Sequence, residues 1–177
     1  MSVVSAGVSS PQHSVVCFQC SSLTPDGPIT SFGTPDGHYS RVCWLPVLGP
    51  TAWVLWGTVA RDLAVGHVLV RDVDELTHAL GLGRPQRLLK ALKRLDRFGI
   101  GIGIGSDSRP GESSWRLHAM CPPLGDQHRR MVSETARRFH NDWIENLDDR
   151  ERHDLYHVLT STYIDHFGGH RTEGNHP

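Results

Sequence analysis

The chain has 177 residues, with 18 Lys plus Arg against 19 Asp plus Glu and a formal net charge of −1. This length favours one ordinary domain with extensions, or two very small domains, and four cysteines are too few for a disulfide scaffold. No apolar run approaches the ~20 residues that cross a bilayer and the N-terminus lacks the features of a signal peptide, so we expect a cytoplasmic protein with no membrane contact.

Turn residues dominate the N-terminal part of the chain. Residues 1–12 consist mainly of Ser, Gly and Val, and we expect a flexible tail there. The tetrapeptide Thr-Pro-Asp-Gly occurs twice and suits a tight turn, because Pro fixes φ and Gly accepts a positive φ. The two turns lie at 24–27 and 34–37, and short β-runs flank them at 14–18, 29–32 and 39–44. The pattern predicts a β-rich arm over residues 13–48.

A helix, a short strand and a second helix follow. A proline at position 50 stands near a first helical position, and apolar residues at helical spacing predict a helix over about 51–64. A β-run is expected near 67–71. Asp72, with Glu75 three residues later, forms a capping-box pattern that opens a short helix through Leu80.

The third helix separates its side chains by chemistry. We expect it over 85–98, after Gly81-Leu82-Gly83 ends the previous helix and before Gly99 closes it. At about 100° per residue, five cations and Gln86 share about a third of the circumference, while Asp96 and the leucines lie elsewhere. The cations of this basic arc are Arg87, Lys90, Lys93, Arg94 and Arg97. A DNA-reading helix requires one face that packs and another that meets phosphates and base edges.

Two strands, at about 100–104 and 115–120, flank a polar loop that contains Gly and Pro, which is typical of a β-hairpin. The alternating glycines of the first strand resemble a nucleotide-binding loop only superficially. Such a loop should follow a strand and open a helix, whereas these glycines follow a helix. We therefore interpret the Ile-Gly alternation as a strand with one buried face.

The distribution of charge agrees with a basic functional surface in the middle of the chain. Residues 50–121 hold ten basic and seven acidic residues, whereas 1–49 and 122–177 each carry a net negative charge. A near-neutral total therefore hides a basic middle region. A merely solvated amphipathic helix is the alternative explanation of the arc, but such a face normally mixes charges of both signs.

The run Glu75-Leu76-Thr77-His78-Ala79-Leu80-Gly81-Leu82, followed by leucines at 88, 92 and 95 and by Gly99-Ile100, is similar to winged helix-turn-helix transcription regulators. The likeness covers about residues 50–120. The chain is broadly similar to bacterial regulators of the multiple-antibiotic-resistance type. Two features depart from the usual pattern of that superfamily. The turn after Gly81 is one residue longer, and Thr77 replaces the customary Ala at the helix–helix contact.

The resemblance implies that the helix at 85–98 reads the major groove of double-stranded DNA. Arg and Gln can each bond two atoms of a base edge, so we expect Arg87 and Lys90 near bases. Arg94 and Arg97 lie further along and are expected at backbone phosphates, and Lys93 is expected to matter least. The full set of expected contact residues is Arg84, Gln86, Arg87, Lys90, Arg94, Arg97, Arg109 and Arg116, the last two from the hairpin.

The C-terminal segment predicts two helices, about 126–147 and 150–167, each with an apolar stripe. The first stripe contains Met131, Thr135, Phe139 and Trp143, and the second contains Leu155, Leu159, Thr162, Tyr163 and Phe167. We expect these helices to form a homodimer interface, because one winged module buries little surface and symmetric half-sites multiply specificity. Truncation after about Pro122 should then leave a folded monomeric module.

Metal and catalytic sites are not expected. Cys17 and Cys20 have the spacing of a zinc knuckle, but a tetrahedral site needs two more ligands and the chain has no second such pair. His153 and His157, four residues apart, are interpreted as surface histidines. No nucleophile stands in a recognisable catalytic context. We therefore expect no metal, no cofactor and no enzymatic activity.

These inferences define a fold class, a domain organisation and a leading function. We expect an α+β protein whose units are a flexible tail (1–12), a β-rich arm (13–48), a winged helix-turn-helix domain (49–121), a C-terminal helical dimerisation segment (122–168) and a second flexible tail (169–177). The leading function is sequence-specific DNA binding in transcriptional regulation. The alternatives are an adaptor that docks a partner protein through the winged module, and a plasmid or phage DNA-maintenance protein.

Overall fold

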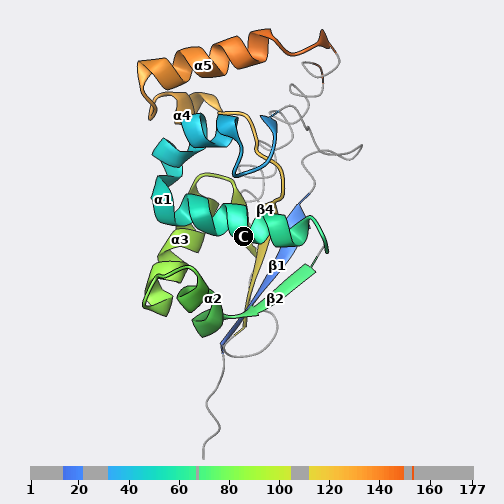
Figure 1. Ribbon diagram of the computed structural model, residues 1–177, viewed down its shortest axis with the longest axis vertical. Coiled ribbons are helices and arrows are strands. Elements are labelled where there is room, and N and C mark those ends of the chain that lie inside the picture. Colours follow the sequence, from blue (N-terminus) through green and yellow to red (C-terminus); the bar gives the residue numbers. More distant parts are fainter. Residues whose placement is uncertain (1–13, 22–31, 67, 105–111, 150–152, 154–177) are drawn as a thin grey trace, which may run out of the picture.

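A computed structural model describes residues 14–21, 32–66, 68–104, 112–149 and 153. Within these residues the chain forms one four-stranded sheet and five helices, so the expected α+β class is confirmed (Figure 1). The elements are β1 (Val15–Ser21), α1 (His38–Leu63), β2 (Val68–Asp72), α2 (Val73–Ala79), α3 (Pro85–Arg97), β3 (Gly101–Ile104), β4 (Glu112–His118), α4 (Asp126–Arg129) and α5 (Glu134–Glu145).

Several sequence predictions fall outside the described residues. They are the tails at 1–12 and 169–177, the turn at 24–27, most of the strand at 29–32, the hairpin loop with Arg109, and the helix at 150–167 apart from residue 153. The second Thr-Pro-Asp-Gly turn is described and confirmed. The amide of Gly37 donates to the carbonyl of Thr34 at 2.9 Å, which closes the turn directly before α1.

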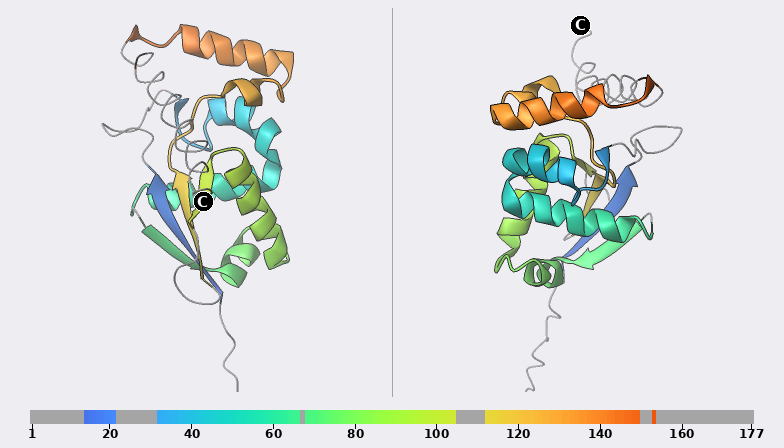
Figure 2. Two further views of the ribbon diagram at one scale, coloured as in Figure 1. Left: turned by 180° about the vertical axis from the view of Figure 1, so that it is seen from behind. Right: turned by 45° about the horizontal axis from the view of Figure 1, so that its top comes forward.

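The sheet has the strand order β2-β1-β4-β3, and α1, α2 and α3 lie on one of its faces (Figure 2). Strand β1 pairs antiparallel with β2 and parallel with β4, while β3 and β4 form the predicted antiparallel hairpin. Val16 and Phe18 of β1 are fully buried. The prediction of a strand at 14–18 is therefore confirmed, but its assignment to a peripheral arm was wrong, because β1 is an inner strand of the sheet.

The predicted β-run at 39–44 is helical and belongs to α1. Tyr39, Ser40, Cys43, Trp44, Val47 and Leu48 are all buried. Adjacent pairs that recur every four residues lie along one broad face of a helix, and that face is buried here. The Tyr, Val and Trp content of the segment favours a strand by local propensity, but the chain buries these side chains in helical register.

Helix α1 breaks at Gly49, which has φ 72° and ψ 163°. Pro50 follows the break and fixes the first turn of the second half, where a proline costs no hydrogen bond. The predicted helix at 51–64 is thus confirmed as the second half of α1, which ends at Leu63. Trp44 and Trp56, one from each half, meet edge to face with ring centroids 6.3 Å apart.

Helix α1 is also long and apolar enough, by length and composition alone, to cross a membrane. Its most apolar stretch has a mean hydropathy of 1.4, which the sequence analysis did not anticipate. Half of that stretch is buried inside the protein. A core helix of this kind meets the same criterion as a membrane span, so the hydropathy of α1 has an explanation in the packing of the fold.

The segment from β2 to α3 follows the sequence prediction closely. The carboxylate of Asp72 accepts hydrogen bonds from the amides of Asp74 and Glu75, both at 2.9 Å, and so caps α2. Gly81 and Gly83 have positive φ and form the turn between α2 and α3. Such a backbone is nearly free of strain only for glycine. The turn therefore reverses the chain within a few residues and brings α3 against α1 and α2.

The C-terminal prediction at 126–147 needs correction, because two helices replace one. Helix α4 ends at Arg129, and α5 starts after Ser133, whose hydroxyl accepts from the amide of Ala136 at 3.2 Å. Met131 lies between them and is 52% exposed, so it is not part of the expected apolar stripe. Phe139 and Trp143 of that stripe pack on Tyr39 of α1. Helices α4 and α5 thus cover the first half of α1 (Figure 1).

Candidate nucleic-acid interface

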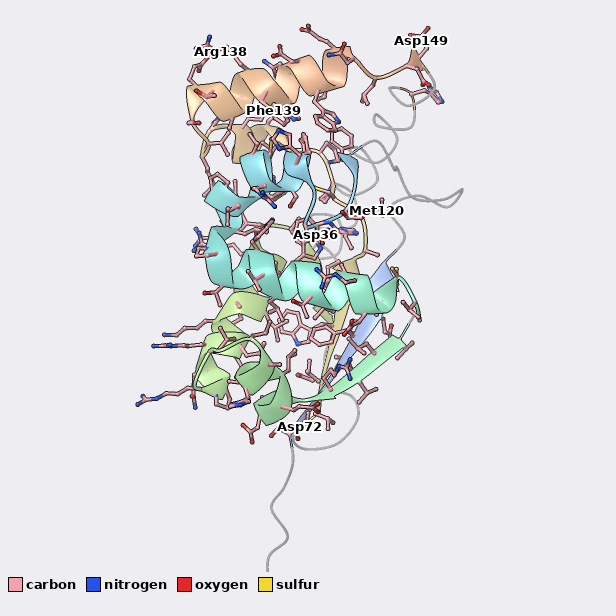
Figure 3. All side chains as sticks on the ribbon, viewed as in Figure 1. Asp36, Asp72, Met120, Arg138, Phe139 and Asp149 are labelled. Atoms are coloured by element: carbon pink, nitrogen blue, oxygen red, sulfur yellow. The ribbon has the colours of Figure 1, made fainter. Side chains whose placement is uncertain are left out.

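Helix α3 has one buried and one basic face. Leu88, Ala91, Leu92 and Leu95 are buried, as the sequence predicts. Leu89, which was expected on the same apolar face, is 42% exposed. Every cation of the basic arc is exposed, and nitrogen-tipped side chains project from α3 away from the sheet (Figure 3). In the folded protein, α3 therefore has a buried apolar face and an exposed basic face.

An open groove of about 600 Å³ lies between α3 and the start of the second half of α1. Its lining residues are Thr51, Ala52, Arg87, Lys90, Ala91, Lys93, Arg94 and Arg97. Five of these eight side chains are cations and none is an acid. The groove gathers four of the eight contact residues that the sequence predicts, together with Lys93, which was expected to matter least.

Arg94 is the most constrained cation of the groove. Its guanidinium donates a hydrogen bond to the carbonyl oxygen of Val47 at 2.8 Å, and it stands over the ring of Phe98 at 5.5 Å. Arg97 stands over the same ring at 5.6 Å. Because a guanidinium has five N–H donors, Arg94 keeps donors for an anion while its position is fixed by α1.

Residues at the N-terminal end of α3 are exposed but do not line the groove. Arg84 precedes the helix in an extended conformation, and Gln86 follows Pro85 in the first turn. Arg87 bridges the two regions, since it lines the groove and donates to the carbonyl oxygen of Leu82 at 3.2 Å. The basic face therefore divides into an open N-terminal end, with Arg84 and Gln86, and a grooved stretch from Arg87 to Arg97.

Strand β4 of the hairpin does not bring Arg116 into this groove. Arg116 of β4 pairs with Ile102 of β3 and is exposed, while its neighbour Leu117 is fully buried. Successive strand residues point to opposite faces, so Arg116 lies on the face of the sheet away from the helices. Arg109 lies outside the described residues.

Sequence reasoning missed Thr51 and did not predict that Lys93 lines a groove. The angular position of Lys93 on the helix is at the edge of the basic arc. That position alone cannot show that α1 lies beside this edge and forms a groove with it. Thr51 carries no local signal at all. It joins the site only because the break at Gly49 sets the direction of the second half of α1.

The cysteine pair of β1 does not converge on one point. Cys17 and Cys20 are three residues apart in a strand, so their side chains leave opposite faces of the sheet. Within the ranges that the structure describes, no group of three or more His, Cys, Asp or Glu side chains is placed to hold a metal ion. Cys43 and Cys121 are buried, and burial raises the pKa of the Cys43 thiol to about 12.

The candidate interface is defined by the geometry of this chain alone. Comparison with known proteins finds no matching family model, no matching curated protein and no matching solved structure. The protein is a mixed α+β protein that presents the amphipathic helix α3. The basic face of α3 forms no ion pair with another described residue. Such a surface is suited to a polyanion.

Proposed function

We propose that this protein is a winged helix-turn-helix protein that binds double-stranded DNA sequence-specifically, and that it acts in transcriptional regulation. The observation that carries the proposal is the exposed basic face of α3, opposite a face buried against α1 and α2. A helix so mounted can enter a major groove while the rest of the fold supports it.

Three further features support the proposal. Helices α2 and α3 are joined by a short turn with two positive-φ glycines, as in a helix-turn-helix. The β3–β4 hairpin follows α3 in the order that a wing requires. Arg84, Gln86 and Arg87 stand exposed at the N-terminal end of α3, where a recognition helix reads base edges.

The test is binding-site selection with purified full-length protein and random duplex DNA. We expect a defined motif for the wild type, and loss of the motif for an Arg87→Ala/Lys90→Ala double variant. The matched control is Arg137→Ala/Arg138→Ala on α5, far from α3 (Figure 3), which removes the same charge and should keep the motif.

The alternative to DNA binding is an adaptor that docks an acidic protein through the same cations. Salt-dependent retention on duplex DNA supports the DNA function, because each phosphate contact releases counterions. Failure of the wild type to bind any duplex, together with loss of a protein partner in the Arg87/Lys90 variant, would favour the adaptor.

A further inference from the structure

The groove between α1 and α3 gathers five cations, and no acidic side chain is among its described lining residues. None of the ion pairs formed between described residues involves Arg87, Lys90, Lys93, Arg94 or Arg97. By contrast, the arginines at 61, 71, 129, 137 and 138 each have a carboxylate partner. The arginines at 41, 84, 116 and 130 also lack a carboxylate partner among the described residues, so what distinguishes the groove is that five such cations line one surface.

This arrangement costs stability in the free protein. Each of the five cations has another one three or four residues away, so each has a like charge beside it on the helix surface. Like charges at these spacings destabilise a helix. An anion in the groove would remove that repulsion. No acidic side chain lines the groove in the part of the chain that the structure describes, and Asp96, the only acid of α3, is turned toward β3, where its carboxylate accepts from the amide of Gly103 at 3.4 Å.

The walls and floor of the groove favour a phosphate group. Arg94 is held in place by the carbonyl of Val47, so it can bind an oxyanion with little further ordering. Thr51 supplies a hydroxyl from the opposite wall. Ala52 and Ala91 between them are small and let a ligand approach the helices closely.

We propose that the α1–α3 groove is a phosphate-binding site that seats the DNA backbone, with Thr51, Lys93 and Arg97 as ligands beside the fixed Arg94. This inference rests on the proposed function and adds to it a division of labour along α3. The N-terminal part of α3, through Lys90, reads bases, although Arg87 and Lys90 also line the groove. The C-terminal part of α3, from Lys93 on, and Thr51 of α1 hold the phosphates.

The chemistry of the groove favours a polymer backbone over a small phosphorylated metabolite. Small-molecule sites are mostly apolar and enclosed, with a few convergent polar groups. This groove is open, and its lining offers no aromatic ring on which a base could stack. A string of cations along its length matches a succession of phosphates.

The test measures full-length variants on two duplexes, the selected motif and an unrelated sequence. Thr51→Val and Lys93→Gln should each weaken binding to both duplexes by the same factor, about three- to tenfold. Lys93→Gln should also lower the salt slope by about one charge. The controls Thr135→Val and Arg138→Gln on α5 are exposed and should change neither quantity. Unchanged affinity of Thr51→Val and Lys93→Gln for both duplexes would overturn the site while leaving the DNA function intact.

A second arm separates failure of the site from failure of the DNA function. Inorganic pyrophosphate is titrated into isotope-labelled protein, and amide shifts are followed by NMR. Shifts centred on Thr51 and the second half of α3, and lost in Lys93→Gln, support the phosphate site even if no duplex binds. Absence of such shifts, together with no duplex binding, overturns both proposals. A pyrophosphate affinity equal to that for duplex DNA overturns the backbone assignment and leaves a free-phosphate site.

Discussion

The hydroxyl of Tyr39 joins three separate parts of the chain. It accepts a hydrogen bond from the amide of Leu124 at 3.0 Å and lies 2.7 Å from Nδ1 of His140. Which of the two groups donates in the second bond depends on the tautomer of the His140 ring. Burial, with a smaller effect of the Arg129 charge, lowers the pKa of His140 to about 4.

Folding stability should therefore fall in mild acid. The ordinary pKa of His140 is 6.5 and its folded-state pKa is about 4, so between these values the unfolded chain binds a proton that the folded chain excludes. Stability from this group is fully present above pH 6.5 and is lost as the pH falls toward 4. At 1.36 kcal/mol per pKa unit the loss reaches about 3 kcal/mol. Urea unfolding at several pH values measures it.

The control for this pH dependence is His140→Gln. It should show a shallower loss of stability between pH 6.5 and 4 than the wild type. Part of the slope should persist, because burial also lowers the pKa of His128. An identical slope in wild type and variant would show that His140 does not carry the effect.

We expect the substitution Thr77→Val to stabilise the protein. Its side chain is 4% exposed, and its hydroxyl oxygen has no hydrogen-bond partner in the part of the chain that the structure describes. Thr77→Val keeps the shape and removes the unsatisfied group, so we expect the free energy of unfolding to rise by about 1 kcal/mol. Thr77→Ser is the control. It keeps the hydroxyl, loses a buried methyl and should lower stability, and a lower stability of Thr77→Val would contradict the argument.

At the scale of elements, Arg94 links α3 to the turn of α1 that precedes the break at Gly49. Arg94→Ala removes the bond to the Val47 carbonyl and a ring contact with Phe98. We expect a loss of about 1–2 kcal/mol in the free energy of unfolding, measured in urea. Arg97→Ala removes only a ring contact and should cost less. Equal losses for the two variants would mean that the tether to α1 contributes nothing.

Elements with strong local signals were predictable from the sequence. The Asp72 cap, the glycines at 81, 83 and 99 and the leucine spacing of α3 define that region through short-range chemistry. The first half of α1 was not predictable in the same way. Its side chains have strand propensity, and it is helical where they pack on α5 and on the segment around Pro122 and His128.

The candidate site also contains residues that local sequence signals predict and residues that only tertiary packing brings into place. The basic face of α3 follows from periodicity, because residues on one helix have fixed angular positions. Thr51 could not be found, since its place beside α3 depends on the break at Gly49 and on the packing of two helices distant in sequence. The position of Arg116 also depends on strand register, which the sequence did not define.

At the scale of the whole molecule, the segments that flank the central region are part of the core. Strand β1 supplies Val16 and Phe18, both fully buried. After β4, the carbonyl of Pro122 accepts from the Trp44 indole at 2.7 Å, and His128 packs between Trp44 and Phe98. Truncation after Pro122 would remove His128 and the partners of Tyr39, so we now expect that variant to lose stability rather than yield a folded monomer.

The expected dimer interface must therefore lie elsewhere than the Phe139–Trp143 stripe. That stripe packs on α1 of its own chain, which leaves the predicted helix beyond residue 153 to supply the contact. If the predicted homodimer and the proposed DNA binding hold, deletion of 154–177 should keep the fold, give a monomer and weaken DNA binding, because one half-site contact remains instead of two. Sedimentation equilibrium and circular dichroism measure assembly and folding.

A deletion variant that still sediments as a dimer would move the interface to another surface. The outer face of the sheet is then the place to test, since Val68 and Val70 are each 59% exposed and Ile102 is 37% exposed. Val70→Lys would place a charge within any contact there, whereas Val65→Lys, at a position 93% exposed beyond α1, is the matched control. Dissociation by Val70→Lys alone would assign the dimer to the sheet, and a dimer that survives both the deletion and Val70→Lys would exclude both surfaces.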